Sequence, residues 1–115
     1  MSKLAPAIVG AVKQVLGYMT KRQYAELVAL TNGARITEEE IERAIAGYGR
    51  RLVLPPDSAY ELMDVIEVRG STPRRWSVVM PLWTAEEGRS DLSIQLTLNE
   101  GPSGIQVELD DIRVL

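Results

Sequence analysis

The feature that most constrains the fold is a pair of alternating segments between Asp91 and Leu115. In both segments every second residue is apolar, and these residues are Leu92, Ile94, Leu96, Leu98, Ile105, Val107 and Leu109. Alternation with a period of two is typical of strands that turn one face to a core and the other to water. The connection Glu100–Gly104 contains two glycines and a proline, so we expect a β-hairpin here.

The alternation changes parity after Leu109, because the next apolar residues are Ile112 and Val114. One extra residue near Asp110–Asp111 restores the register and therefore predicts a β-bulge. A bulge bends its strand, so we expect a bent sheet with a concave face that other elements must fill. The alternative is that the strand ends at Asp110 and the remaining tail is loose.

Apolar residues at three- and four-residue spacing predict three helices before the strands. Their stripes are Leu4, Ile8, Val12, Val15, Leu16 and Met19 in the first, Tyr24, Leu27 and Val28 in the second, and Ile41, Ala44, Ile45 and Tyr48 in the third. Thr20–Gln23 and Thr37–Glu40 both have the form of a capping box, which we expect to start the second and third helices. Gly33 is expected to cap the end of the second helix, and Gly47 and Gly49 to end the third.

Three more extended segments precede the hairpin. Arg51–Leu54 is predicted to be a short strand or an extended lead-in, and Tyr60–Arg69 a strand with apolar residues on both faces. Trp76–Leu82 alternates again, but Pro81 places it at an edge or breaks it. No helix separates the long strands, so we predict one α+β domain over residues 1–115. It consists of three N-terminal helices packed on a bent antiparallel sheet of about four long strands.

Composition restricts the chemistry. The chain has no cysteine and no histidine, which excludes disulfides, thiolate nucleophiles and the most common general base. We therefore expect no metal site and no cofactor, and the residue types argue against an enzyme without deciding the question. Residues 1–54 carry a net charge of +3 and residues 55–115 a net charge of −6. The pI near 5.0 argues against nucleic acid as the main ligand. No apolar run reaches membrane-spanning length, and we expect a cytoplasmic protein.

The chain resembles the NTF2-like (cystatin-like, SnoaL-like) superfamily in its order of helices and strands, in the break at Thr20, and in the terminal hairpin with its bulge. The stretches WSVVMPLWTAEEGRSDLSIQLTL (Trp76–Leu98) and VELDDIRVL (Val107–Leu115) are similar to a family of small bacterial domains of unknown function. The resemblance implies helices over the concave side of a bent sheet, forming a cone. The superfamily includes isomerases, cyclases, dehydratases, ligand carriers and dimerisation modules, so the resemblance assigns no activity. The His–Asp dyad of its enzymes cannot be transferred, because this chain lacks histidine.

Several residues are candidates for a site. Asp64 interrupts an apolar run, so it either sits in a pocket with a raised pKa, as a general base would, or points to solvent. A ligand pocket would add hydroxyls from Tyr18, Tyr24, Tyr48 and Tyr60, although such tyrosines more often pack in a core. The bulge would bring Asp110 and Asp111 to one side, to bind a cation, to pair with Arg113 or simply to tolerate the bulge. Arg74, Arg75 and Trp76 form either a cation–π or anion-binding patch or, more simply, ordinary charge beside a turn.

Three functions remain open from the sequence. The first is a non-catalytic binding module, a homodimer that packs the outer faces of its sheets or binds a protein partner. The residues expected at that interface are Trp76, Trp83, Ser93, Gln95 and Thr97. The second is a small-molecule isomerase or cyclase that uses Asp64 with a tyrosine. The third is an immunity or antitoxin-like protein that blocks a toxin with its acidic half. No nucleic-acid or membrane partner is expected.

Overall fold

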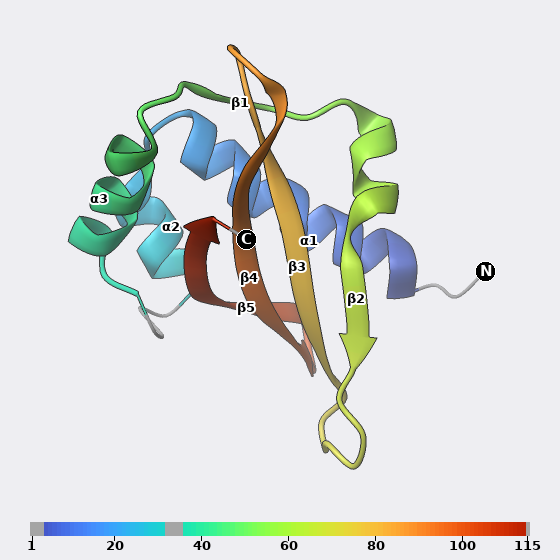
Figure 1. Cartoon of the computed structure of the whole chain (residues 1–115). Coiled ribbons are helices and arrows are strands. Elements are labelled where there is room, and N and C mark those ends of the chain that lie inside the picture. The colour runs from blue at the N-terminus through green and yellow to red at the C-terminus, as the bar shows by residue number, and fades with distance from the viewer. Residues whose placement is uncertain (1–3, 32–35, 115) are drawn as a thin grey trace.

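The computed structural model of the chain describes residues 4–31 and 36–114. The three helices come first, and a short strand, a 3₁₀ helix and four more strands follow. Their bounds are α1 (Leu4–Thr20), α2 (Tyr24–Leu30), α3 (Glu38–Tyr48), β1 (Leu52–Val53), η1 (Asp57–Leu62), β2 (Asp64–Glu67), β3 (Arg75–Thr84), β4 (Gly88–Gly101) and β5 (Gly104–Val114). Figure 1 shows the helices on one side of a curled sheet, so the α+β class with N-terminal helices is confirmed.

All strand pairs in the sheet are antiparallel, and the order of the main path is β1-β3-β4-β5. Strand β2 pairs with β3 as well, beyond β1 along the same edge. The sheet therefore has five strands, of which three are long, rather than about four long ones. The difference lies in Tyr60–Arg69, predicted as one strand. Tyr60 belongs to η1, where Met63 N–H donates to its carbonyl at 3.4 Å, and β2 has only four residues.

Helix α1 buries the predicted stripe, since Ile8, Val12, Val15, Leu16 and Met19 are all at most 6% exposed. The predicted break at Thr20 is present, but its mechanism is wrong. Helix α1 runs through Thr20, whose hydroxyl donates to the Gly17 carbonyl at 3.2 Å. Helix α2 begins after Gln23, which makes no side-chain cap.

The turn after α1 is a C-terminal cap of the Schellman type. Arg22 N–H donates to Met19 O at 3.1 Å, and Gln23 N–H donates to Tyr18 O at 2.9 Å. Arg22 takes the left-handed conformation that this motif requires, with a φ of 58°. The two bonds satisfy carbonyls at the end of α1, so Thr20–Gln23 closes one helix instead of opening the next.

The capping box at Thr37 is confirmed. Glu40 N–H donates to Thr37 Oγ1 at 3.1 Å, and Thr37 N–H donates to Glu40 Oε1 at 3.1 Å. Helix α3 ends at Gly49, which is left-handed with a φ of 75°. The cap predicted at Gly33 lies outside the described residues.

The terminal hairpin has the predicted bulge. Gln95 pairs with Asp111 and Leu96 with Leu109, which leaves Asp110 as the extra residue of β5. Strand β3 continues through Pro81, but its register against β4 shifts between Pro81 and Trp83. The prediction that Pro81 marks an edge strand or a break in the strand is therefore wrong, because β3 is unbroken and has neighbours on both sides. Pro81 is accommodated where that side of β3 is unpaired, between the segments that pair with β2 and β1.

The space between the helices and the sheet is filled by aliphatic side chains. Val12, Val15 and Met19 contribute from α1, and the fully buried strand residues are Val78, Met80, Ile94, Leu96, Leu98 and Leu109. These side chains belong to one continuous cluster, and α1 and α3 both pack against β5. The concave side of the sheet is therefore a packed core.

Candidate functional site

Asp64 does not lie inside that core. It is exposed on β2, opposite Val79, while its neighbour Val65 lies opposite the buried Val78. Because strand side chains alternate, Asp64 points to the face of the sheet away from the helices. The hypothesis that Asp64 lies in an enclosed pocket is therefore wrong. The apolar run around it belongs to an edge strand that is exposed on both faces.

The four tyrosines lie apart. Tyr24 lines a groove between the helices. The Tyr48 hydroxyl donates to Glu87 Oε2 at 3.1 Å, at the turn between β3 and β4. Tyr60 lies under the ammonium group of Lys13, 5.2 Å from the ring centroid, and Tyr18 packs against the core. The structure does not bring the four hydroxyls together around a ligand.

The residues predicted at a dimer interface are mostly covered within one chain. Trp76 and Ser93 are each 4% exposed, which is too little for either to form a surface patch. Trp83, Gln95 and Thr97 are half-buried. The guanidinium of Arg74 lies 5.1 Å from the Trp76 ring centroid, so the predicted cation–π contact is confirmed.

The two aspartates at the bulge face the same side of the sheet. Thr97 Oγ1 donates to Asp110 Oδ2 at 2.6 Å, and Asp111 pairs in register with Gln95 on the same face. Asp111 also lies 3.9 Å from Arg113 Nε, which is the predicted ion pair. Within residues 4–31 and 36–114, no group of three or more acidic residues is placed to hold a metal ion.

An exposed apolar segment runs along the outer edge of the sheet. Leu62, Val65, Ile66 and Val68 are 46%, 40%, 66% and 40% exposed, and we refer to Leu62–Val68 as the β2 edge. Val68 N–H donates to the Arg75 carbonyl of β3 at 2.8 Å. Hydrogen bonds alternate along an antiparallel strand, so the backbone groups of Val65 and Glu67 point away from β3. The β2 edge therefore offers apolar side chains together with backbone donors and acceptors.

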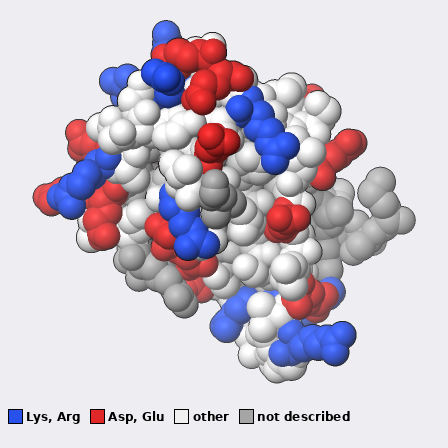
Figure 2. All heavy atoms as spheres, viewed as in Figure 1, with Lys and Arg blue, Asp and Glu red and all other residues white. Residues whose placement is uncertain are grey.

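Charge changes sign along the β2 edge. Asp57, Glu61 and Asp64 lie at its start, and Arg69, Arg74 and Arg75 follow its end. Figure 2 shows the basic side chains gathered at the lower tip of the molecule, where Figure 1 places the β2–β3 connection. Glu67 is held by Arg74 through two hydrogen bonds of 2.8 and 2.9 Å. These bonds lower the pKa of Glu67 and leave its charge compensated locally.

The opposite edge of the sheet is different. Strand β5 carries the bulge at Asp110 and the charged residues Glu108, Asp111 and Arg113, and α1 and α3 pack against it. Bulges, charges and covering helices are the usual means by which proteins block strand pairing at an edge. Strand β2 itself carries charges only at its first and last residues, Asp64 and Glu67, with two apolar residues between them.

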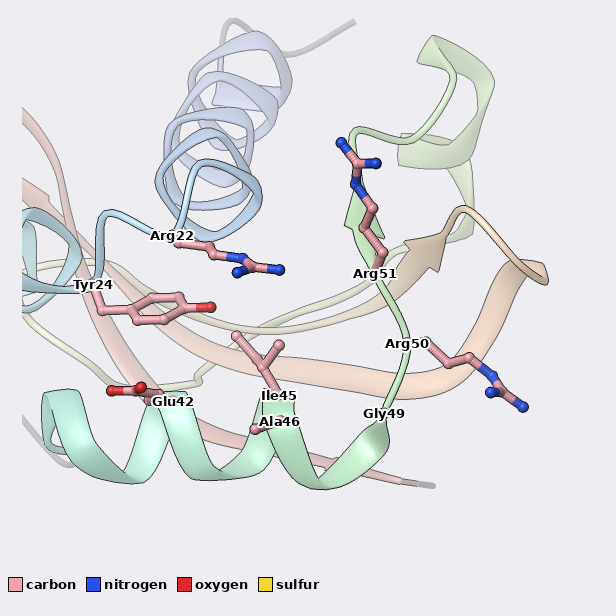
Figure 3. Close-up of a pocket in the computed structure, with 8 residues that line it drawn as sticks. All are labelled: Arg22, Tyr24, Glu42, Ile45, Ala46, Gly49, Arg50 and Arg51. Atoms are coloured by element: carbon pink, nitrogen blue, oxygen red, sulfur yellow. The ribbon is translucent and has the colours of Figure 1, made fainter.

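A groove of about 390 Å³ lies between the turn after α1 and the end of α3 (Figure 3). Figure 3 shows the Arg22 guanidinium and the Tyr24 hydroxyl pointing into the same space above Ile45, with Ala46 beside it and Arg51 across the opening. A second hollow of about 300 Å³ continues it and shares Arg22, Tyr24 and Ile45. We refer to the two together as the helix groove.

The helix groove is basic. Its cations are Lys21, Arg22, Arg50 and Arg51, and Glu42 is its single acidic lining residue. Arg50 Nε lies 3.9 Å from Glu87, outside the groove. In the described part of the chain, no carboxylate lies within 4.0 Å of the charged groups of Arg22 or Arg51. Burial raises the pKa of Tyr24, Arg22 opposes that rise, and Glu42 adds to it.

Sequence reasoning did not identify either surface. The helix groove collects side chains from the α1–α2 turn, α3 and the segment before β1, and the only signal for it was the positive charge of residues 1–54. The β2 edge was hidden within a segment predicted as one longer strand with apolar residues on both faces.

A protein-family model matches residues 16–115, and that family is described as a domain of unknown function (DUF7668). Comparisons with curated proteins and with solved structures found no match. Among the helices formed by the described residues, none is long and apolar enough to cross a bilayer.

Proposed function

Because the chain belongs to this family of domains of unknown function (DUF7668), we propose its function from its surface: it is a non-catalytic interaction module that pairs with a second copy of itself along the β2 edge. The observation that carries this proposal is the exposure of four large apolar side chains beside backbone groups that point away from the sheet. Exposed strand edges of this kind favour pairing with another strand.

The interior of the molecule supports a non-catalytic role. The side of the sheet that faces the helices is packed with aliphatic residues, and Asp64 lies outside it. The isomerase or cyclase hypothesis requires an open cone with Asp64 and a tyrosine inside, and no such arrangement supports it. No observation favours the immunity or antitoxin-like hypothesis. The NTF2-like resemblance remains part of our proposal, supported by helices that cover one face of a curled sheet.

The hydrogen-bond pattern restricts how two copies pair. Only Val65 and Glu67 direct their backbone groups outward, so a two-fold axis at Ile66 places Val65 opposite the partner's Glu67. The two Ile66 side chains, the most exposed apolar groups of the β2 edge at 66%, then meet at the axis. In antiparallel strands such directly opposed side chains contact each other closely.

Charge supports a second copy as the partner. Acidic residues lie before or near the start of the β2 edge (Asp57, Glu61 and Asp64), and basic residues follow its end (Arg69 and Arg75). An antiparallel arrangement lays the acidic start of each copy beside the basic end of the other. Complementary charges of this kind favour the correct partner and register. The pairing removes apolar surface from water at both copies simultaneously.

Sedimentation velocity over micromolar to near-millimolar concentrations tests the dimer. We expect the wild-type chain to form a dimer and Ile66→Lys to remain a monomer, because two ammonium groups would meet at the axis. Val114→Lys is the matched control, since Val114 is also exposed, at 58%, but lies on β5 at the opposite edge. It should dimerise like the wild type.

A wild-type chain that stays monomeric throughout this range would overturn the proposal. A dimer that survives Ile66→Lys but dissociates with Gln95→Arg would instead assign the interface to the outer face of the sheet, as the sequence suggested. Circular dichroism of each variant shows whether the fold is retained.

A further inference from the structure

We propose that the helix groove is a binding site for a small organic anion, whose phosphate or carboxylate group is held by Arg22 and the Tyr24 hydroxyl. This site is independent of the proposed dimer, because the residues that line the groove belong to the helical side and none lies on the β2 edge.

The charge of the groove selects an anion. Besides Arg50, whose guanidinium pairs with Glu87 outside the groove, three cationic residues line it against one carboxylate. The guanidinium groups of Arg22 and Arg51 have no acidic partner within 4.0 Å among the described residues. Glu42, the one acidic residue, lies near the base of the Tyr24 ring, away from the Arg22 guanidinium in Figure 3. A guanidinium fork binds the paired oxygens of phosphate or carboxylate groups through two parallel hydrogen bonds.

Two backbone carbonyls at the end of α3 already have a donor within the chain, because Gly49 N–H donates to Ala46 and Ile45 at 3.1 and 3.4 Å. The hydroxyl of Tyr24 adds a neutral donor beside the guanidinium of Arg22.

The shape of the groove selects an organic ligand over an inorganic ion. Its volume of about 390 Å³, continued by about 300 Å³, falls within the range of small-molecule sites. The side chains of Ile45 and Ala46 and the ring of Tyr24 provide apolar surface for the body of the ligand. The anionic group would lie at Arg22 and the apolar part would extend along α3.

The backbone at Arg22 provides the independent observation. Its φ of 58° is the single positive value among the described non-glycine residues, at a helix-end position that glycine usually occupies. Such strain is concentrated at functional sites. Figure 3 shows the guanidinium of this residue pointing into the groove.

Titration of the ¹⁵N-labelled full chain, followed by NMR, tests this site. The probes are phenyl phosphate and benzoate as anions, phenol as the neutral analogue, and inorganic phosphate. We expect saturable chemical-shift changes at the backbone amides of residues 19–24 and 45–52 with phenyl phosphate or benzoate. The anion that binds more tightly identifies the preferred head group. Phenol and inorganic phosphate should bind at least about tenfold more weakly. Phenol lacks the anionic group that would bind Arg22, and inorganic phosphate lacks the apolar ring that would pack along α3.

Two variants separate the site from a general charge effect. Arg22→Gly keeps the backbone conformation and should weaken binding of the anion at least about tenfold. Arg43→Gln is the matched control, because Arg43 is an exposed cation of α3 that does not line the groove. This variant should bind the anion with the same affinity as the wild type.

The proposal would be overturned if phenol bound as tightly as phenyl phosphate, or if both variants lost the same amount of affinity for the anion. It would also be overturned if the chemical-shift changes were scattered over the whole chain. Shifts confined to residues 62–68 would assign the anion to the β2 edge instead. Sedimentation of the same samples reports the dimer separately, so failure of one proposal is distinguishable from failure of the other.

Discussion

At the scale of single residues, Arg22 is the position where local preference and structure disagree. The Schellman turn after α1 requires a left-handed residue, and a side chain with a Cβ pays a conformational cost there that glycine avoids. Nothing in the two backbone hydrogen bonds of the turn requires an arginine. Under our proposal, the arginine side chain serves the helix groove, which it lines.

Replacement of Arg22 by glycine is expected to stabilise the protein by about 1 kcal/mol, because it relieves the left-handed strain. Urea denaturation of the full chain measures the effect. Arg50→Gly is the control: Arg50 is a nearby exposed arginine without a positive φ, so the added chain freedom and the loss of its ion pair with Glu87 should slightly lower the stability of that variant. A lower stability of Arg22→Gly would show that the arginine contributes more to the turn than its strain costs.

At the scale of elements, the two threonine boxes show how similar patterns differ in outcome. Thr37 and Glu40 exchange both capping bonds at the start of α3, whereas the Thr20 hydroxyl bonds back to Gly17 within α1. Both four-residue segments, Thr20–Gln23 and Thr37–Glu40, have the capping-box pattern in the sequence. The outcome is decided by whether the preceding helix has already used the turn for its own C-terminal cap.

Thr37→Ala is therefore expected to cost about 1 kcal/mol of unfolding free energy, since it removes the side-chain acceptor at the N-cap of α3. Thr20→Ala, its matched control, should change stability by less than half of that amount. Chemical denaturation of both variants under the same conditions makes the comparison. Equal losses would contradict the assignment of the Thr20 turn to the end of α1.

The elements also show what the sequence could predict. The bulge at Asp110 was predictable, because a change of parity is visible in the strand itself. The shortness of β2 was not, because an edge strand exposed on both faces and one covered on both faces carry the same apolar run. The helix groove was not predictable either, since its lining depends on how the end of α1, α3 and the segment before β1 meet in space.

At the scale of the whole molecule, the two proposed surfaces lie on different layers. The β2 edge belongs to the sheet, and the helix groove belongs to the covering helices. The packed core between them makes the two layers unfold together, so association at one surface should stabilise the entire fold. Binding that favours the native state raises its unfolding temperature with concentration.

The melting temperature of the wild-type chain should therefore rise as protein concentration increases, while that of Ile66→Lys should stay constant. Differential scanning calorimetry at several concentrations makes this comparison. Val114→Lys, altered at the other edge, should follow the wild type. A melting temperature of the wild type that is independent of concentration would contradict dimerisation through the β2 edge.

The unequal protection of the two sheet edges has a consequence for assembly. Open-ended fibres require two compatible free edges on each molecule, so that every added subunit exposes a new one. Here α1, α3 and the bulge at Asp110 obstruct the β5 edge. In the dimer that we propose, pairing of β2 with β2 would occupy the accessible edge of both molecules, and growth would stop at two subunits. The same asymmetry between the edges would then keep the association finite.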